Sequence, residues 1–298
     1  MDRLSTGCKG IDDLMMGGVP RGVATGFFGV PNIGKTWCCK QIAVKCILPE
    51  KEGGFNKKVL YVDTESFFKD KETRDLYWSY FSKRWSIPSN LRDRMEIRII
   101  PDIFKLGSLF GIEFTIIQEK ERVSAIAKYP RKESSDKEPQ KSSIQAENWI
   151  EYSPLYKEMK KEDYGLVVID SITVPIKAVI PKSTQNLPGR GTLEDPLLSA
   201  FSLIAGEFDI PVLFTNHAVR DPMRQSYLKQ WGGDDMLFFI KRWFGILEGL
   251  KEQKNQYGDR VRRIYRYRYP GLDPMVSLAL LQKDMGYIDP EDLKRGKG

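Results

Sequence analysis

The feature that most constrains this chain is a glycine-rich loop that runs directly into a lysine and a threonine. Residues 29–36 read Gly-Val-Pro-Asn-Ile-Gly-Lys-Thr. A loop with this spacing curls its backbone N–H groups around a phosphate at a helix N-terminus. Its lysine then reaches the β- and γ-phosphates, and its threonine hydroxyl faces Mg²⁺. The loop therefore predicts a nucleotide site, with contacts from Gly29, Val30, Pro31, Asn32, Ile33, Gly34, Lys35, Thr36 and Trp37.

The context of the loop predicts an α/β fold. A hydrophobic strand (24–28) precedes it, and a helix (35–47) with an apolar stripe follows and stops before Pro49. Strand-like runs alternate with helical patterns along most of the chain, which is typical of a parallel sheet with crossover helices. After residue 238 the pattern changes to strands and turns that indicate antiparallel hairpins. The other expected strands are 59–62, 96–100, 166–169 and 212–215, with a helix from 193 to 208 before the last of them.

Two carboxylates follow buried strands of this predicted sheet. Asp170 comes directly after the run 166–169, where a carboxylate can hold Mg²⁺ through water. Glu65 follows the strand 59–62, where it can polarise the water that attacks the γ-phosphate. The alternatives are a turn cap at Asp170 and a helix N-cap at Glu65. We expect Thr36 and Asp170 to hold the metal.

A polar tip also follows the strand 212–215, at Asn216 and His217. Such a tip can contact the γ-phosphate, although a lone histidine can equally be structural. We therefore expect Lys35, Glu65 and His217 to act on the phosphates or on the attacking water.

Composition excludes several classes of protein. Hydrophobic residues make up 41% of the 298 and charged residues 29%, as in ordinary globular proteins. The sequence has no long apolar window and no secretory leader, so we expect a soluble intracellular protein. The four cysteines show no Cys-x-x-Cys pair, and we expect them to be free and buried.

Charge is unevenly distributed along the chain. The net charge is +7, and residues 241–270 hold nine basic residues against three acids. Clustered arginine is typical of nucleic-acid binders. Residues 119–163 instead hold ten basic and ten acidic residues, so we expect a charged surface insertion there that is flexible in its middle. Otherwise residues 1–298 are expected to form one domain.

Several motifs, taken in order, resemble those of the RecA-like recombinase family, and are most similar to archaeal RadA and its paralogs. They are Ser5-Thr6-Gly7, Gly17-Gly18, the phosphate loop, Asp63-Thr64-Glu65, Asp170-Ser171, Gly189-Arg190-Gly191 and Thr215-Asn216-His217. The resemblance covers the whole chain except 119–163. It implies a RecA-like ATPase core, ATP and Mg²⁺ as ligands, Glu65 as the catalytic glutamate and the 216–217 tip as the γ-phosphate sensor. That sensor is usually glutamine in the family.

The resemblance also maps two DNA-contacting loops onto residues 179–191 and 219–233. Basic loops at the carboxyl edge of a parallel sheet suit the backbone of single-stranded DNA. Plain solvated loops are the alternative. The expected DNA-binding residues are Lys182, Arg190, Arg220, Arg224 and Lys229.

A second basic segment, residues 260–269, alternates arginine with tyrosine at its end. With a period of two, Arg266 and Arg268 face one side and Tyr265, Tyr267 and Tyr269 the other. An edge strand with a cationic outer face explains this pattern, and a phosphate-tracking surface is the alternative.

The sequence departs from the family pattern in two respects. The core begins almost at Met1, so the family's N-terminal domain and its polymerisation linker are expected to be absent. The family's adenine-stacking arginine has no clear match, and Arg74 is the candidate replacement. These departures favour a core-only RadA paralog, similar to RadB or RadC, that is a monomer or small oligomer.

The expected function is that of an archaeal, nucleoid-associated cytoplasmic ATPase that binds single-stranded DNA and a RadA-type recombinase. It would assist homologous recombination and DNA repair, with slow, DNA-dependent hydrolysis of ATP. Two alternatives remain: an ATP-gated protein adaptor and a KaiC-like signalling ATPase, neither with a DNA role.

Overall fold

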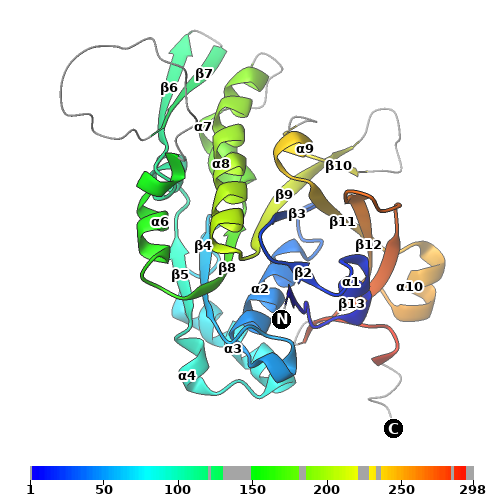
Figure 1. Cartoon of the computed structure of the whole chain (residues 1–298). Helices are drawn as coiled ribbons and strands as arrows, with labels where there is room; N and C mark the ends of the chain where they lie inside the picture. Colours follow the sequence, from blue (N-terminus) through cyan, green and yellow to red (C-terminus); the bar gives the residue numbers. More distant parts are fainter. Residues whose placement is uncertain are drawn as a thin grey trace.

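The computed structural model describes residues 2–119, 122–129, 149–180, 186–220, 228–232, 236–282 and 285–292 (Figure 1). The strands are β1 (Arg3–Leu4), β2 (Val19–Pro20), β3 (Ala24–Gly29), β4 (Lys58–Asp63), β5 (Met95–Ile99), β6 (Glu113–Glu119), β7 (Arg122–Lys128), β8 (Tyr164–Asp170), β9 (Val212–Arg220), β10 (Leu228–Gln230), β11 (Arg242–Glu248), β12 (Val261–Arg268), β13 (Val276–Gln282) and β14 (Gly286–Ile288). The helices are α1 (Lys9–Leu14), α2 (Lys35–Ile47), α3 (Lys71–Trp85), α4 (Ser89–Arg92), α5 (Ile103–Leu109), α6 (Pro154–Met159), α7 (Thr173–Val179), α8 (Leu187–Phe208), α9 (Met236–Phe239) and α10 (Lys251–Tyr257), with short 3₁₀ turns at Glu50–Glu52 and Trp149–Tyr152.

Ten strands of the described chain form one sheet in the order β14-β13-β12-β11-β3-β9-β8-β4-β5, with β10 paired to β9. The strands from β11 to β5 are parallel, and β11 to β14 pair antiparallel. The predicted α/β fold, a mostly parallel sheet with antiparallel C-terminal strands, is therefore confirmed. The hairpin β6–β7 and the pair β1–β2 form separate small sheets.

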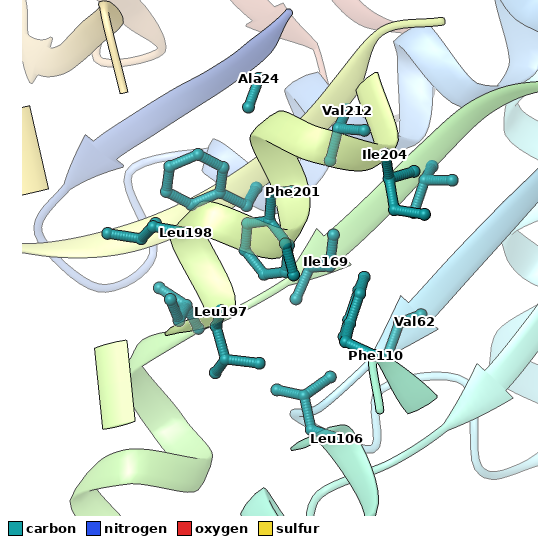
Figure 2. Packing of buried hydrophobic residues seen from close by; sticks show 14 of the residues in the cluster. Ala24, Val62, Leu106, Phe110, Ile169, Leu197, Leu198, Phe201, Ile204 and Val212 are labelled. Carbon is teal, nitrogen blue, oxygen red and sulfur yellow. The ribbon is translucent and has the colours of Figure 1, made fainter. Parts of the chain in front are cut away.

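Helices cover both faces of the central sheet, so its strands are buried on each side. Successive side chains of the central strands point alternately into two cores. On β3, Phe27 packs in the core that holds α1, α2 and α3, whereas Phe28 packs in the core beneath α5 to α9. Figure 2 shows this second core, where Leu197, Phe201 and Ile204 of α8 lie on the sheet.

The centre of the sheet leaves no room for a side chain at Gly26. A Cβ there would lie 2.6 Å from the Trp243 ring and 2.8 Å from that of Phe214. The two rings lie edge to face, with centroids 5.1 Å apart. A glycine is therefore required where these bulky aromatic residues meet across β3.

The described parts of residues 119–163 pack into the core of the domain and do not lie only on its surface, as a surface insertion would. Val123, Ile150 and Leu155 are buried in the core beneath α8. The strand β7 packs against the beginning of that helix, where the Val123 N–H donates to Asn186 Oδ1 over 2.9 Å. Residues 130–148, the predicted flexible middle, lie outside the described residues.

The predicted helix 35–47 has the bounds of α2, and the four cysteines are free and buried. None of the described helices is both long and apolar enough to cross a membrane.

Candidate active site

The phosphate loop joins β3 to α2 as the sequence predicts. Gly29 ends the strand and Lys35 begins the helix. Gly34 has φ of 115°, and a Cβ there would lie 2.3 Å from the Tyr287 hydroxyl, so no other residue fits. Arg262 Nε and the Tyr287 hydroxyl both donate to the Ile33 carbonyl, over 3.0 and 3.4 Å. Residues from the antiparallel end of the sheet thus hold the loop in shape.

Lys35 lies in this loop with its ammonium turned onto the loop's own backbone. Its Nζ donates to the carbonyls of Gly29 and Val30 over 3.1 and 3.0 Å. Burial lowers the pKa of Lys35, and the negative charges of Asp170 and Glu65 partly oppose this shift. The side chain is 7% exposed. An ammonium has three donors, so one of them is left for an anion.

Strand register brings the polar ends of the neighbouring strands to this loop. Gly29 pairs with His217 across β3 and β9. Asp63 pairs with Asp170 across β4 and β8. Since these strands are parallel, their carboxyl ends meet at one edge of the sheet. The residues predicted separately at strand ends therefore lie together.

Asp170 is the best-connected of these residues. Its Oδ1 accepts hydrogen bonds from the hydroxyls of Thr36 (3.2 Å) and Thr215 (2.5 Å). Its Oδ2 accepts one from the Tyr61 hydroxyl at 2.7 Å. The contact between Asp170 and Thr36 links the two predicted metal residues directly. A carboxylate beside a hydroxyl is an oxygen donor set of the kind that Mg²⁺ prefers, so the residues fit this ion.

Sequence reasoning missed Tyr61 and Thr215. Tyr61 lies two residues before Asp63, so the period of a strand places both on one face of β4. Thr215 is a polar residue in the apolar run that leads to Asn216. Both signals were available in the sequence. Their significance depends on the proximity of Asp170, which the strand order determines.

Glu65 lies just past the end of β4, in a turn held by Asp63. The Asp63 carboxylate accepts from the N–H groups of Glu65 (3.0 Å) and Phe68 (2.7 Å). Although Glu65 is an exposed residue, partial desolvation by its neighbours raises the pKa of its carboxyl. The charge of Asp170 acts in the same direction, whereas a hydrogen bond from Ser171 opposes it. The carboxyl group thus lies close to both Asp170 and the phosphate loop.

His217 lies within β9, which continues to Arg220 instead of ending at Thr215 as predicted. The parallel pairing with β3 stops at His217, and β10 then pairs with the remainder. Its Nδ1 lies 2.8 Å from Lys177 Nζ. Because an ammonium can only donate, Nδ1 accepts this hydrogen bond and the ring proton sits on Nε2. Partial burial lowers the pKa of His217 to about 4, and the charges of Lys177 and Lys35 reinforce the shift.

Asn216, beside it, has a structural role. Its Oδ1 accepts from the Thr173 hydroxyl at 2.5 Å, and its Nδ2 donates to the Trp231 carbonyl at 2.7 Å. The residue is fully buried. Of the predicted tip, only the side chain of His217 is therefore available to a ligand.

Trp37, the last predicted nucleotide contact, is half-buried at the start of α2. Its ring packs against Tyr80 and Phe81 of α3, with centroids 5.9 Å away in each case. Arg74, the predicted adenine-stacking residue, lies in the N-terminal part of α3. The structure places the two residues on adjoining helices.

The prediction for Arg190 as an exposed loop residue is wrong. It belongs to α8, which begins at Leu187, and its side chain is 7% exposed. Its guanidinium lies 5.3 Å from the centre of the Trp231 ring, and Lys177 Nζ lies 5.1 Å from the same ring. Trp231, which sequence reasoning missed, also donates its N–H to the His217 carbonyl over 2.9 Å. The Trp231 ring therefore gives this buried arginine a contact inside the fold.

The other predicted DNA-binding residues are placed only in part. Lys229 is half-buried in β10. Arg220 ends β9, and its side chain is not described. Lys182 and Arg224 lie outside the described residues.

The prediction of an edge strand at residues 260–269 is also wrong. The strand β12 lies between β11 and β13. Arg266 is buried, with Nε and Nη2 donating to the Leu14 carbonyl over 3.2 and 2.9 Å. Tyr265 and Tyr267 do share one face, packing edge to face on Phe28. Tyr269, past the end of the strand, packs on Phe244 in the opposite core.

Comparison with known proteins supports the family resemblance. The family model described as Rad51 matches residues 1–84. The DNA repair and recombination protein RadA of Aeropyrum pernix is 26% identical over 225 residues, which cover 74% of this chain and 54% of that protein. The DNA repair protein RAD51 homolog 2 of Mus musculus is 27% identical over 215 residues, or 72% of this chain and 50% of that protein.

A shorter match has higher identity. The DNA repair protein RAD51 homolog 2 of Arabidopsis thaliana is 38% identical over 73 residues, covering 24% of this chain and 20% of that protein. In the two longer matches the chain spans about half the length of the relative. The chain is thus similar, at low identity, to proteins described as RadA and RAD51 homologues, and its first 84 residues match the Rad51 family model.

Proposed function

We propose that this chain binds and hydrolyses ATP with Mg²⁺, binds single-stranded DNA and assists a RadA-type recombinase in homologous recombination and repair. The observation that best supports the ATPase part is the convergence at one sheet edge. There the phosphate loop, Asp170 and His217 meet through strand register, and Glu65 follows at the end of β4.

Each residue at this edge has a different role towards ATP and Mg²⁺. Lys35 exchanges its two loop carbonyls for the terminal phosphates of ATP. Thr36 and Asp170 would hold Mg²⁺, which neutralises phosphate charge and polarises the γ-phosphoryl group. Tyr61 and Thr215 fix the Asp170 carboxylate by donating to its two oxygens.

Glu65 accepts a proton from the attacking water. The desolvation that raises its pKa makes the carboxylate a better base than an ordinary surface glutamate. His217 supplies a donor, because Lys177 occupies Nδ1 and leaves the Nε2–H available. A neutral imidazole of this kind can hydrogen-bond a phosphate oxygen as a glutamine amide does.

Support for the DNA role is the resemblance and the similarity to proteins described as recombination and repair proteins. Arg190 packs on Trp231, so we assign the phosphate contacts to Lys182, Arg220, Arg224 and Lys229 instead. Trp231 connects the start of α8 to His217, which gives the two proposed loops a common support beside the nucleotide site.

Steady-state ATPase assays with and without single-stranded DNA test the proposal. Lys35→Ala is expected to weaken ATP binding, and Glu65→Gln to keep binding and lose turnover. Hydrolysis by Glu65→Gln at the wild-type rate would show that the assigned base is wrong. A rate of ATP hydrolysis that is the same with and without DNA would favour a signalling ATPase. Tight ATP binding without turnover, combined with binding to a RadA-type protein, would favour an ATP-gated adaptor.

A further inference from the structure

A buried lysine lies one turn beyond the phosphate loop on α2. Lys40 is 1% exposed and four residues after Thr36. The partners that the described residues give its ammonium are aromatic rings rather than a carboxylate. Its Nζ lies 3.0 Å from the ring centre of Phe67, 4.4 Å from Phe68, 5.7 Å from Tyr77 and 5.9 Å from Trp37.

A buried ammonium in this position lowers the stability of the fold. Removing an ammonium from water is unfavourable unless a charge or strong hydrogen bonds replace the lost hydration. Aromatic faces return only part of that free energy. An unbranched apolar side chain such as methionine would occupy the same space without this cost. The choice of lysine therefore calls for a role beyond packing.

The two rings nearest to the Lys40 ammonium, those of Phe67 and Phe68, belong to the turn that carries Glu65. Phe67 and Phe68 follow Glu65 by two and three residues. Ser66, between them and Glu65, has φ of 58°, a left-handed conformation that non-glycine residues rarely adopt. A turn containing such a residue persists only where its surroundings hold it.

The two ends of the turn are held differently. On the β4 side, Asp63 accepts the N–H groups of Glu65 and Phe68. Phe68 is fully buried and packs edge to face on Tyr61, which donates to Asp170. Phe67 is 45% exposed, and its ring packs on the Lys40 ammonium and on Phe68. The Lys40 ammonium thus holds the outer part of the turn.

We propose that Lys40 is a positioning residue for Glu65, whose turn it fixes through contact of its ammonium with the rings of Phe67 and Phe68. The inference rests on the proposed function, in which Glu65 activates water. The carboxylates of Asp170, Asp63 and Glu65 favour the charged form, although burial lowers the pKa of Lys40 to about 7. The positive charge of Lys40 is therefore favoured by the same carboxylates that form the proposed active site.

The test compares Lys40→Met with a matched control on the same helix. Lys45 is also buried, at 5%, and its Nζ also lies over an aromatic ring, 5.4 Å from the centre of Trp85. Lys45→Met removes a buried charge nine residues after Thr36, about two and a half turns along α2. The Lys45 ammonium also donates to the Glu52 carbonyl. Lys40→Met is expected to lower kcat by about 10- to 100-fold, because small displacements of a reacting group have effects of that size. Its Kd for a fluorescent ATP analogue should change less than about threefold, and Lys45→Met should change neither quantity beyond about twofold.

A second comparison separates positioning from general damage. In a Glu65→Gln background, Lys40→Met should cause no further loss of turnover, since the group that it positions is already absent. Phe67→Leu removes a ring that is 45% exposed, so it should lower kcat in the same way even if Lys40→Met fails to fold. Phe67→Tyr keeps an aromatic ring at this position and should keep the wild-type kcat. The inference about Lys40 would be overturned if Lys40→Met and Phe67→Leu both kept the wild-type kcat. It would also be overturned if Lys40→Met lowered turnover further in the Glu65→Gln background. Neither result would affect the assignment of Glu65 as the base. Full turnover by Glu65→Gln itself would overturn both the inference and the assignment of the base.

Discussion

Arg266→Met tests whether the basic strand β12 is a structural element or an open cationic surface. The Arg266 guanidinium is buried and donates twice to the carbonyl of Leu14, the last residue of α1. Its Nη1 donates to the carbonyl of Asp273 over 2.8 Å. Leu14 is fully buried, so its carbonyl has no ready access to replacement water, whereas Asp273 is exposed.

The size of the effect follows from these contacts. Losing a charged donor to a buried carbonyl costs about 2–3 kcal/mol, and the exposed carbonyl adds little because water replaces the donor. Methionine refills most of the volume. With an unfolding entropy of about 0.6 kcal/mol/K for a chain of this length, the melting temperature should fall by about 3–5 °C.

Differential scanning fluorimetry provides the measurement, with Arg268→Met as the control. Arg268 ends the same strand and is only half-buried, and its substitution should shift the melting temperature by less than about 1 °C. Equal shifts for the two variants would refute the structural reading of Arg266. So would an unchanged melting temperature accompanied by weaker DNA binding.

Two further predictions concern charge. His217 is the sole histidine in the sequence, so its imidazole gives a single set of NMR signals, which should titrate near pH 4 and not near 6.5. Because the pKa of His217 is lowered in the folded state, the contribution of this residue to stability is full above pH 6.5 and is lost as the pH falls towards 4. The melting temperature of His217→Gln should therefore depend less on pH over that range than the melting temperature of the wild type. The affinity for single-stranded DNA should fall steeply with salt, and each lost phosphate contact should reduce the slope by about 0.7. An unchanged slope after joint alanine substitution of Arg220, Arg224 and Lys229 would place the DNA surface elsewhere.

Much of the site could be predicted because its signals are local in sequence. The phosphate loop needs glycine where φ is positive, and a helix must follow at once, so the motif predicted the bounds of α2 correctly. Polar residues after apolar strands marked Asp170 and Glu65. Strand register, which pairs Gly29 with His217, then turned separate candidates into one site.

The errors arose where a charge had a partner distant in sequence. Arginine is usually exposed, so the mapped loop at Arg190 and the period-two pattern at Arg266 both predicted open basic surfaces. The Trp231 ring lies beside the Arg190 guanidinium, and the Leu14 carbonyl accepts a hydrogen bond from Arg266. Neither contact has a signal in the local pattern, because both depend on the folded positions of other elements.

The helix α2 shows how the same limitation affects the centre of the site. The apolar stripe predicted the helix itself, but it did not indicate that 11 of its 13 residues are buried. One of these buried residues, Gln41, makes three hydrogen bonds. Its Nε2 donates to the carbonyls of Thr6 and Tyr287, and its Oε1 accepts a hydrogen bond from the Tyr287 N–H. Hydrophobic contacts tolerate small rotations of a helix, whereas three hydrogen bonds from one amide do not. A helix anchored in this way holds the phosphate loop at its N-terminus in a fixed orientation, and Lys40 on the same helix can then fix the turn of Glu65 relative to that loop.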